Sequence, residues 1–183
     1  VSSVTIDNRK AGYEAASFLI QNGCKQIAFI SAGQLYGSSF ERGTGVKEAV
    51  LDAGLLPDDV LYLDEGLTYK AGRRAAERLL RMDSLPDAVF SASDAAAIGL
   101  MHTFLEHGVQ PGKDISVMGF DNNPIAEYYN PPLTTVAQPQ REIGLQAMEL
   151  LLEKIHDPAS PPSEIRLPHQ LVIRESVRLL ERP

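Results

Sequence analysis

Four short apolar runs at nearly even spacing constrain the fold of this chain more than any other feature of its sequence. They begin near residues 27, 60, 88 and 115, and the segments between them carry apolar residues at helical spacing. The run at 26–31 is almost continuously apolar, which is typical of a strand buried on both faces of a parallel sheet. A period of about thirty residues is what a strand with its crossover helix requires. The pattern therefore predicts an α/β fold, a doubly wound parallel sheet with right-handed connections.

The alternation of strands and helices ends after Asp121. A loop from 122 to 132 contains three prolines, and a short extended piece follows at 134–136. A long helix is expected from about 139 to 155, and a last strand at 171–173. A chain of 183 residues is long enough to bury one domain core of ordinary size.

The charge balance argues against direct contact with nucleic acid by this part of the protein. Lys and Arg number 17 against 24 Asp and Glu, giving a net charge of -7 and no general positive field for a phosphate backbone. No stretch approaches the roughly 20 apolar residues that a membrane span needs. The segment from Val1 to Asp7 also lacks the basic start and apolar centre of a secretion signal. We therefore expect a cytoplasmic protein with no membrane partner.

The sequence lacks the usual catalytic and metal-binding patterns. Its four histidines are scattered, and Cys24, the single cysteine, can neither form an intrachain disulfide nor build a metal cluster. HExxH, GxSxG and phosphate-binding P-loop motifs do not occur. Gly43 and Gly45 lie inside a helical pattern without the third glycine of a dinucleotide fingerprint, which favours close helix packing. The sequence thus predicts no catalytic residue, no metal and no cofactor, and hence no enzyme.

Polar residues follow several of the predicted strands, and in an open parallel sheet ligands bind outside the carboxyl ends of the strands. Ser31 ends the first core strand, Ser93 and Asp94 follow the third, and Asp121 follows the fourth. Arg42 lies in the first turn of the helix after Ser31 and can reach the same cleft. A carboxylate that accepts and a guanidinium that donates hydrogen bonds suit a neutral polyol.

Each candidate also has a structural interpretation. Asp94 is equally suited to cap the following helix. Arg42 could instead pair with Glu41 or Asp52 on the surface. Asn122 and Asn123 next to Asp121 are better interpreted as turn formers.

Short motifs spread over nearly the whole chain carry a family resemblance. In chain order they are Val4–Asn8, Leu19–Gly23, Arg42–Gly43, Pro86–Phe90, Ser93–Asp94, Ala97–Gly99, Asp114–Asn122, Pro132–Val136 and Gln138–Pro139. On these motifs the chain resembles the lactose-repressor/galactose-repressor (LacI/GalR) family of transcription regulators. The sensor domain of that family is similar to type I periplasmic sugar-binding proteins. Each motif alone is weak, but their common order makes the resemblance specific.

The resemblance implies a two-lobed sensor of which this chain supplies mainly one lobe. Residues 8–134 and 167–180 would form the C-terminal lobe. The segment 135–166, with its long helix, would belong to an N-terminal lobe whose other strands are not in this chain. The helix would then expose an apolar face that includes Ile143 and Leu150, together with Ala147 and Leu151.

By position, the resemblance also implies a set of effector-binding residues. They are Tyr36, Ser38, Arg42, Leu67, Asp94 and Asp121. Leu67 departs from the family, which often places an aromatic ring there against the ligand. An aliphatic side chain weakens the case for a stacked purine or a flat sugar face.

The resemblance implies partners as well. The effector would be a small molecule, a sugar or a similar polar compound, and it would act by closing the two lobes. DNA would be contacted only through an N-terminal helix-turn-helix, which does not precede Val1 in this chain. A homodimer would form through Ala95–Ile98 and the segment after Asp121, although an alanine run is equally natural as helix packing on the sheet.

The alternative function is a periplasmic sugar-binding protein of a transport system, because that class shares the sensor fold. The motifs Ser116–Asn122 and Leu133–Val136 favour the regulator.

Overall fold

A six-stranded sheet forms the centre of the protein in the computed structural model, which describes residues 1–33 and 37–180. Its strand order is β3-β2-β4-β5-β6-β8. The strands are β2 (Ile27–Ile30), β3 (Val60–Leu63), β4 (Ala88–Ser91), β5 (Ser116–Asp121), β6 (Thr134–Ala137) and β8 (Gln170–Val172). Neighbouring strands are parallel except β8, which runs antiparallel to β6. The predicted α/β class with a mainly parallel sheet is confirmed.

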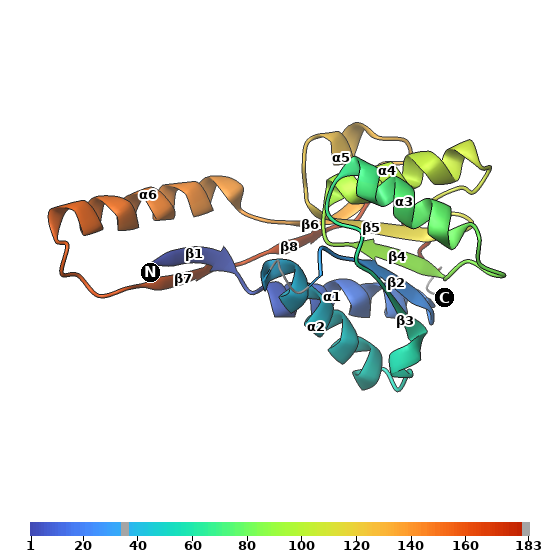
Figure 1. Cartoon of the computed structure of the whole chain (residues 1–183), viewed down its shortest axis with the longest axis horizontal. Coiled ribbons are helices and arrows are strands. Elements are labelled where there is room, and N and C mark those ends of the chain that lie inside the picture. The colour runs from blue at the N-terminus through green and yellow to red at the C-terminus, as the bar shows by residue number, and fades with distance from the viewer. Residues whose placement is uncertain (34–36, 181–183) are drawn as a thin grey trace.

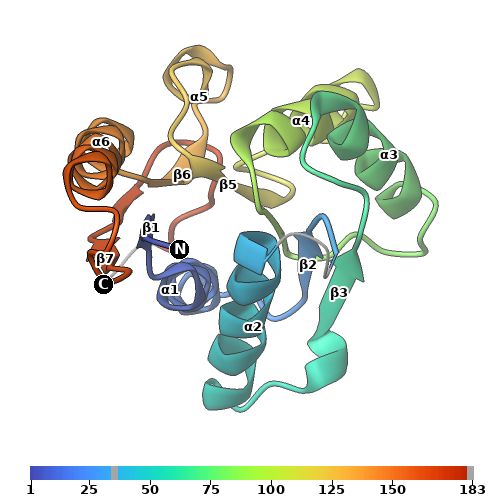
Figure 2. The same cartoon turned by 60° about the vertical axis from the view of Figure 1, so that its left-hand side comes forward.

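Helices cover both faces of this sheet, as the doubly wound pattern predicts. On one face lie α1 (Asn8–Gln21) and α2 (Gly37–Asp52), and on the other α3 (Tyr69–Leu79) and α4 (Asp94–Glu106). Figures 1 and 2 show the two helix layers with the strands between them. Each face has its own apolar core because the strand side chains alternate between the faces. The short helices η1 (Pro57–Asp59) and α5 (Ile125–Tyr128) complete the body.

Glycines let the two helices of the first layer approach closely. A Cβ added to Gly12 of α1 would lie 2.1 Å from the carbonyl oxygen of Arg42 in α2. A Cβ added to Gly45 would lie 2.0 Å from the carbonyl oxygen of Arg9. Of the two glycines around Thr44, Gly45 therefore serves the predicted helix packing, whereas a Cβ at Gly43 would lie 3.0 Å from Cε1 of Phe29 in the sheet. The same close approach brings Arg42 next to the beginning of α1.

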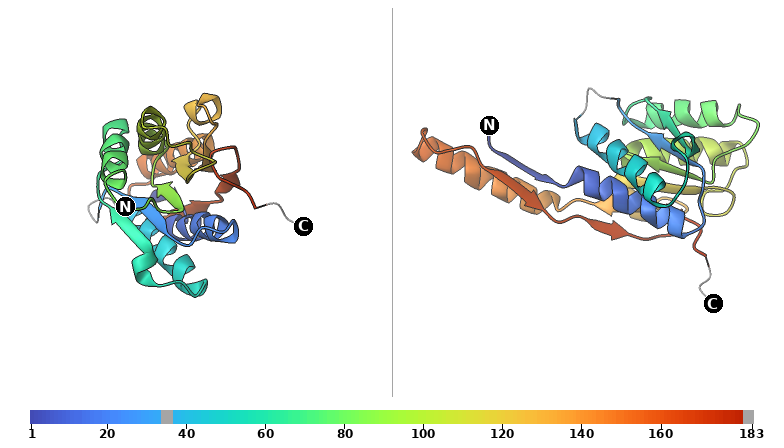
Figure 3. Two further views of the ribbon diagram at one scale, coloured as in Figure 1. Left: turned by 90° about the vertical axis from the view of Figure 1, so that its right-hand side faces the viewer. Right: turned by 90° about the horizontal axis from the view of Figure 1, so that it is seen from below.

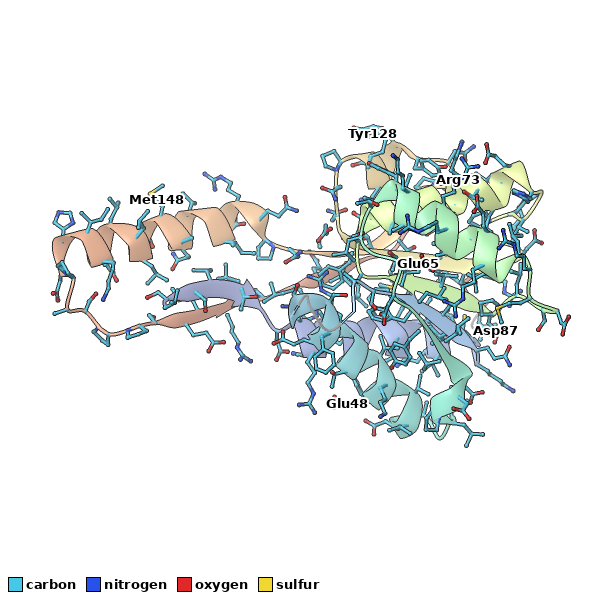
Figure 4. All side chains as sticks on the ribbon, in the orientation of Figure 1. Glu48, Glu65, Arg73, Asp87, Tyr128 and Met148 are labelled. Atoms are coloured by element: carbon cyan, nitrogen blue, oxygen red, sulfur yellow. The ribbon has the colours of Figure 1, made fainter. Side chains whose placement is uncertain are left out.

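A narrow extension projects from this body (Figures 1 and 3). It consists of β1 (Ser3–Ile6), α6 (Gln140–His156) and β7 (Glu164–Leu167), with β1 and β7 paired in parallel. None of the residues of α6 is buried. Leu145, Met148, Leu151, Leu152 and Ile155 are its most exposed large apolar residues. Figure 4 shows Met148 on the side of α6 that faces away from β1 and β7.

The division between body and extension differs slightly from the predicted lobes. Strand β6 continues to Ala137 in the large sheet, so residues 135–137 belong to the body and not to the predicted 135–166 segment. Leu167 ends β7 in the extension, although the predicted C-terminal lobe resumed at 167. Strand β1, placed in neither range, pairs with β7. Hydrogen bonding decides these boundaries, and the apolar pattern alone does not locate them.

Candidate ligand-binding site

Arg42 occupies the middle of the body at the carboxyl ends of the strands. Its Nε donates to Asn8 Oδ1 at 3.0 Å and its Nη1 donates to the Ala92 carbonyl at 2.7 Å. The guanidinium lies over the Phe120 ring, 3.5 Å from the centroid. Only 6% of the residue is exposed, so it does not form the predicted alternative surface pair with Glu41 or Asp52.

A row of aromatic rings beneath the sheet leads to this cation. The ring centroids of Phe29 and Phe90 are 5.3 Å apart, and those of Phe90 and Phe120 are 6.5 Å apart. Register explains the first contact, because Phe29 and Phe90 are direct partners on β2 and β4. Burial in this apolar setting lowers the pKa of Arg42 to about 10, while the charges of Asp121 and Glu41 act in the opposite direction. Arg42 therefore remains a cation at neutral pH.

Asp121 ends β5 beside this cation. Its Oδ1 accepts a hydrogen bond from Gln138 Nε2 at 2.7 Å, and its carbonyl accepts one from Gln140 Nε2 at 3.4 Å. Burial raises the pKa of the Asp121 carboxyl, against the charge of Arg42 and the bond from Gln138, which lower it. Among the described residues Arg42 and Asp121 form no direct ion pair, although their charges act on each other.

The backbone at Asp121 is unusual for residues with side chains. Asp121 has φ 116° and Asn122 has φ 56°. Such positive values are disfavoured for residues with a Cβ and persist only where neighbouring groups hold them. Asn122 Oδ1 accepts from Arg174 Nη2 at 2.9 Å, which fixes the turn from the C-terminal segment. The predicted role of Asn122 as a turn former agrees with this geometry.

Asp94 lies beneath the site and does not face the solvent. The residue is 0% exposed. Its Oδ2 accepts from the Asn123 backbone N–H at 2.7 Å, and its Oδ1 accepts from Thr135 Oγ1 at 2.6 Å. The cap of α4 is Ser93, whose Oγ accepts from the Ala96 backbone N–H at 3.2 Å. Since both carboxylate oxygens bond to the protein, direct effector contact by Asp94 has no support in this geometry.

The other predicted effector residues are placed less centrally. Ser38 is exposed in the first turn of α2. Leu67 packs against the apolar core on the α1 and α2 side, and its carbonyl accepts from Ser93 Oγ at 2.8 Å. Tyr36 lies outside the described residues. The structure thus brings Arg42 and Asp121 together, while effector contacts by Ser38, Leu67 and Tyr36 stay predictions.

A cavity of about 460 Å³ lies where the extension meets the body. Its lining includes Asn8, Glu41 and Thr44 from the body, with Glu164 and Arg166 from β7. Asn8 connects the cavity to the buried cation, because its Oδ1 accepts from Arg42. A second cavity of about 500 Å³ lies between α2 and β3, and neither Arg42 nor Asp121 lines either of the two cavities. We place the candidate site at the first cavity and the adjoining Arg42 and Asp121, because, of these two cavities, only the first is lined by Asn8, which bonds to Arg42.

Sequence reasoning missed several residues of this arrangement. Asn8 and Gln138 belong to the motifs Val4–Asn8 and Gln138–Pro139, and Phe120 and Thr135 lie in predicted strands, but none of the four is predicted from the sequence to be part of a site. Asn8 and Gln138 follow strand ends by one or two residues, the same signal that found Asp121. Within the described ranges, no cluster of three or more His, Cys, Asp or Glu side chains could hold a metal ion. None of the described helices has the length and apolar character needed to span a bilayer.

Comparison with known proteins gives consistent matches. The family model for the periplasmic binding protein-like domain matches residues 16–177. The transcriptional repressor PurR of Vibrio atlanticus (strain LGP32) is 36% identical over 176 residues, which are 96% of this chain and 53% of the relative. Catabolite control protein A of Priestia megaterium is 34% identical, over 97% of this chain and 54% of the relative. The chain therefore spans about half the length of the curated relatives it matches.

Solved structures agree with these matches. A LacI family transcriptional regulator from Enterococcus faecium, solved with bound ribose, has a TM-score of 0.92 at 31% identity. That match covers 98% of this chain and 66% of the other. The transcriptional regulator CelR in complex with cellobiose has a TM-score of 0.88 at 35% identity, covering 96% of this chain and 54% of the other.

Proposed function

We propose a function on one premise: this chain belongs to the periplasmic binding protein-like domain family, in the branch of the LacI-type transcription regulators. The chain is the effector-sensing part of a DNA-binding repressor. Its effector is a sugar or a similar small polar molecule, and the site binds this molecule without transforming it. A repressor acts where the DNA is, so we place it in the cytoplasm.

One observation carries this proposal. Arg42 and Asp121 come from distant parts of the chain, yet both lie at the same end of the sheet and their charges interact. Asp121 Oδ1 is bonded to Gln138, while its second oxygen has no partner among the described residues. A buried cation and a partly free carboxylate can bind adjacent hydroxyls from two sides. That chemistry fits the sugars found in the related structures with ribose and cellobiose.

The alternative of a transport protein has less support. The matched relatives named above are repressors or transcription regulators, and none of their names describes a transporter component. A regulator also needs a path from the ligand to the rest of the protein. Gln138 and Gln140 offer one, because both bond to Asp121 and lead directly into α6 of the extension. Ligand binding at Asp121 can therefore bias the angle between body and extension, in the manner of lobe closure.

We further propose that the protein is a homodimer that joins through the α3, α4 and α5 face. Ala96 and Ala97 are buried against their own sheet, so they act in helix packing and cannot reach a second copy. Tyr128 in α5, labelled at the top of Figure 4, is 78% exposed, and Tyr69 at the start of α3 is also exposed. Aromatic residues of this kind are enriched at protein interfaces.

The experiment is a titration of the intact protein with D-ribose, cellobiose and a panel of neutral sugars. Binding is measured by the thermal shift of the protein and by isothermal titration calorimetry. Asp121→Ala should abolish the response while the unbound protein still unfolds cooperatively. The matched control is Asp114→Ala, because the Asp114 carboxylate also accepts one hydrogen bond, from the Gln110 backbone N–H, and lies beyond the opposite end of β5. An unchanged sugar response in Asp121→Ala, or a loss in Asp114→Ala alone, would contradict the assigned site.

A further inference from the structure

We propose that Asp94 is a positioning residue whose buried carboxylate holds the turn at 122–123, and through it the Asp121 side chain, in the orientation that ligand binding requires. The inference rests on the proposed function, because it concerns the same site. It differs from the predicted role, since Asp94 would act without touching the ligand.

The contacts of Asp94 converge on the turn that follows Asp121. Its Oδ2 accepts from the Asn123 backbone N–H at 2.7 Å. Its Oδ1 accepts from Thr135 Oγ1 at 2.6 Å, and the same Thr135 oxygen accepts from the Asn122 backbone N–H at 3.4 Å. One carboxylate on α4 therefore fixes two successive amides, one directly and one through β6.

Glycine at position 119 makes this arrangement possible. A Cβ at Gly119 would lie 2.3 Å from Asp94 Oδ1, so any other residue there would displace the carboxylate. The turn needs such support because Asp121 and Asn122 both have positive φ. Without partners for the Asn122 and Asn123 amides, Asp121 and Asn122 would relax toward ordinary backbone angles, and the Asp121 side chain would leave its place near Arg42.

The charge of Asp94 matters to this role. An ionised carboxylate accepts on both oxygens, whereas the protonated acid has one O–H and fewer acceptor positions. Burial raises the pKa of Asp94 to about 6, and the charge of Asp121 acts in the same direction. The bonds from Thr135 and Asn123 and the charge of Arg174 lower it. Protonation in mildly acidic solution should therefore loosen the turn.

The first test needs no ligand. In the intact protein, the backbone amide resonances of Asn122 and Asn123 should shift together with the Asp94 carboxyl signal, with a midpoint at about pH 6, by NMR. In Asp94→Asn that transition should disappear. Thr135→Val, which removes one bond but keeps the carboxylate, should shift the Asn122 amide and retain the transition. Amides that do not titrate in the wild type would overturn the proposal.

The second test measures affinity for D-ribose, or for cellobiose if ribose does not bind. At neutral pH, Asp94→Asn should weaken binding by about tenfold, the usual effect of losing a charged hydrogen bond. As the pH falls through about 6, the ratio of mutant to wild-type dissociation constants should shrink, because protonation of Asp94 imitates the substitution. A merely structural role would keep that ratio constant, and such a result would overturn the proposal.

The matched control is Asp87→Asn. Asp87 Oδ2 accepts from the Lys25 and Gln26 backbone N–H groups at 2.7 and 2.9 Å, a similar clamp at the other end of the sheet. Figure 4 shows Asp87 at that end, far from the extension. Its loss should affect stability and leave sugar affinity unchanged. If the wild type binds neither sugar, the proposed function loses its support, and the amide titration alone decides the role of Asp94.

Discussion

The guanidinium of Arg42 stacks on Phe120, with its central carbon 3.5 Å from the ring centroid. This contact joins α2 to the residue that directly precedes Asp121 on β5. Two neighbouring residues of β5 thus place the charged groups of the candidate site: Phe120 holds the Arg42 cation, and Asp121 supplies the carboxylate. Lysine has a point charge and no planar fork, so it could not make the same stack and hydrogen bonds together.

We therefore expect Arg42→Lys to weaken sugar binding by about tenfold or more, since it removes the bonds to Asn8 and Ala92 along with the stack. Isothermal titration calorimetry with D-ribose or cellobiose measures this loss. The control is Arg73→Lys, because Arg73 is exposed, pairs with Glu77 on the surface of α3 and does not line the candidate cavity. Equal affinity in Arg42→Lys and the wild type would argue against a ligand role for Arg42.

A second prediction concerns the packing of α1 against α2. Gly12→Ala should destabilise the protein by about 2 kcal/mol or more, because the new Cβ meets the Arg42 carbonyl at 2.1 Å and the backbones must separate. Gly144→Ala in α6 has no heavy atom within 4 Å and should stabilise its helix by about 0.5–1 kcal/mol. Chemical denaturation of the two variants compares them directly. A neutral Gly12→Ala would mean that the two helices can move apart without cost.

The third prediction is a pH dependence of stability. The pKa of Asp94 is raised from 3.8 to about 6 in the folded state, so the folded protein binds this proton more tightly than the unfolded chain does. The resulting stabilisation is complete below about pH 4 and is lost as the pH rises through about 6, with a limit of roughly 3 kcal/mol.

The free energy of unfolding, measured with denaturant at several pH values, should therefore decrease in the wild type relative to Asp94→Asn as the pH rises from about 4 to about 7. Asp121 titrates in both proteins, so the difference retains only the part of its contribution that depends on the charge of Asp94. A constant difference from about pH 4 to about 7 would show that Asp94 titrates normally. The expected result also implies that the protein with ionised Asp94, the form that holds the turn, is less stable than the protein with protonated Asp94. Such a cost in stability is common at functional sites.

A fourth prediction concerns the apolar surface of α6. Met148 is 54% and Leu152 is 48% exposed, and both lie on a helix without buried residues. Leu152→Lys should reduce self-association of this chain, measured by sedimentation velocity, and change its stability by no more than about 0.5 kcal/mol.

Leu150→Lys serves as the contrast, because Leu150 is half-buried and lines the hollow against β1. That substitution should lower the melting temperature. If Leu152→Lys self-associates as the parent chain does, the outer side of α6 takes no part in association.

The sequence alone was sufficient to predict the layers of the fold. Apolar runs at 27, 60, 88 and 115 correspond to β2, β3, β4 and β5. The signal is strong because β2, β4 and nearly all of β5 are buried on both faces, while the edge strand β3 keeps an apolar run although Tyr62 is exposed. The placement of β1 and β7 outside the main sheet had no such signal. Both are short, and only their mutual pairing reveals the extension.

The candidate site was predictable where a residue follows a strand end. Arg42 and Asp121 were found in this way, and the structure brings them together. Asp94 satisfied the same rule, but its orientation depends on the space left by Gly119, which lies on another strand. Which way a side chain points at a strand end is decided by contacts between distant residues, and local sequence patterns do not contain that information.

The polypeptide passes between the body and the extension at three places: after β1, after β6 and after β7. The last of these, at His169, is tied to α1, since its Nε2 lies 2.8 Å from Glu14 Oε2. Segments joined by three neighbouring tethers cannot slide or separate freely, so a hinge-like rotation about the line of tethers is the motion left to them. In such a rotation the extension moves as a rigid unit, so a small displacement near the tethers produces a larger displacement at the far end of the extension.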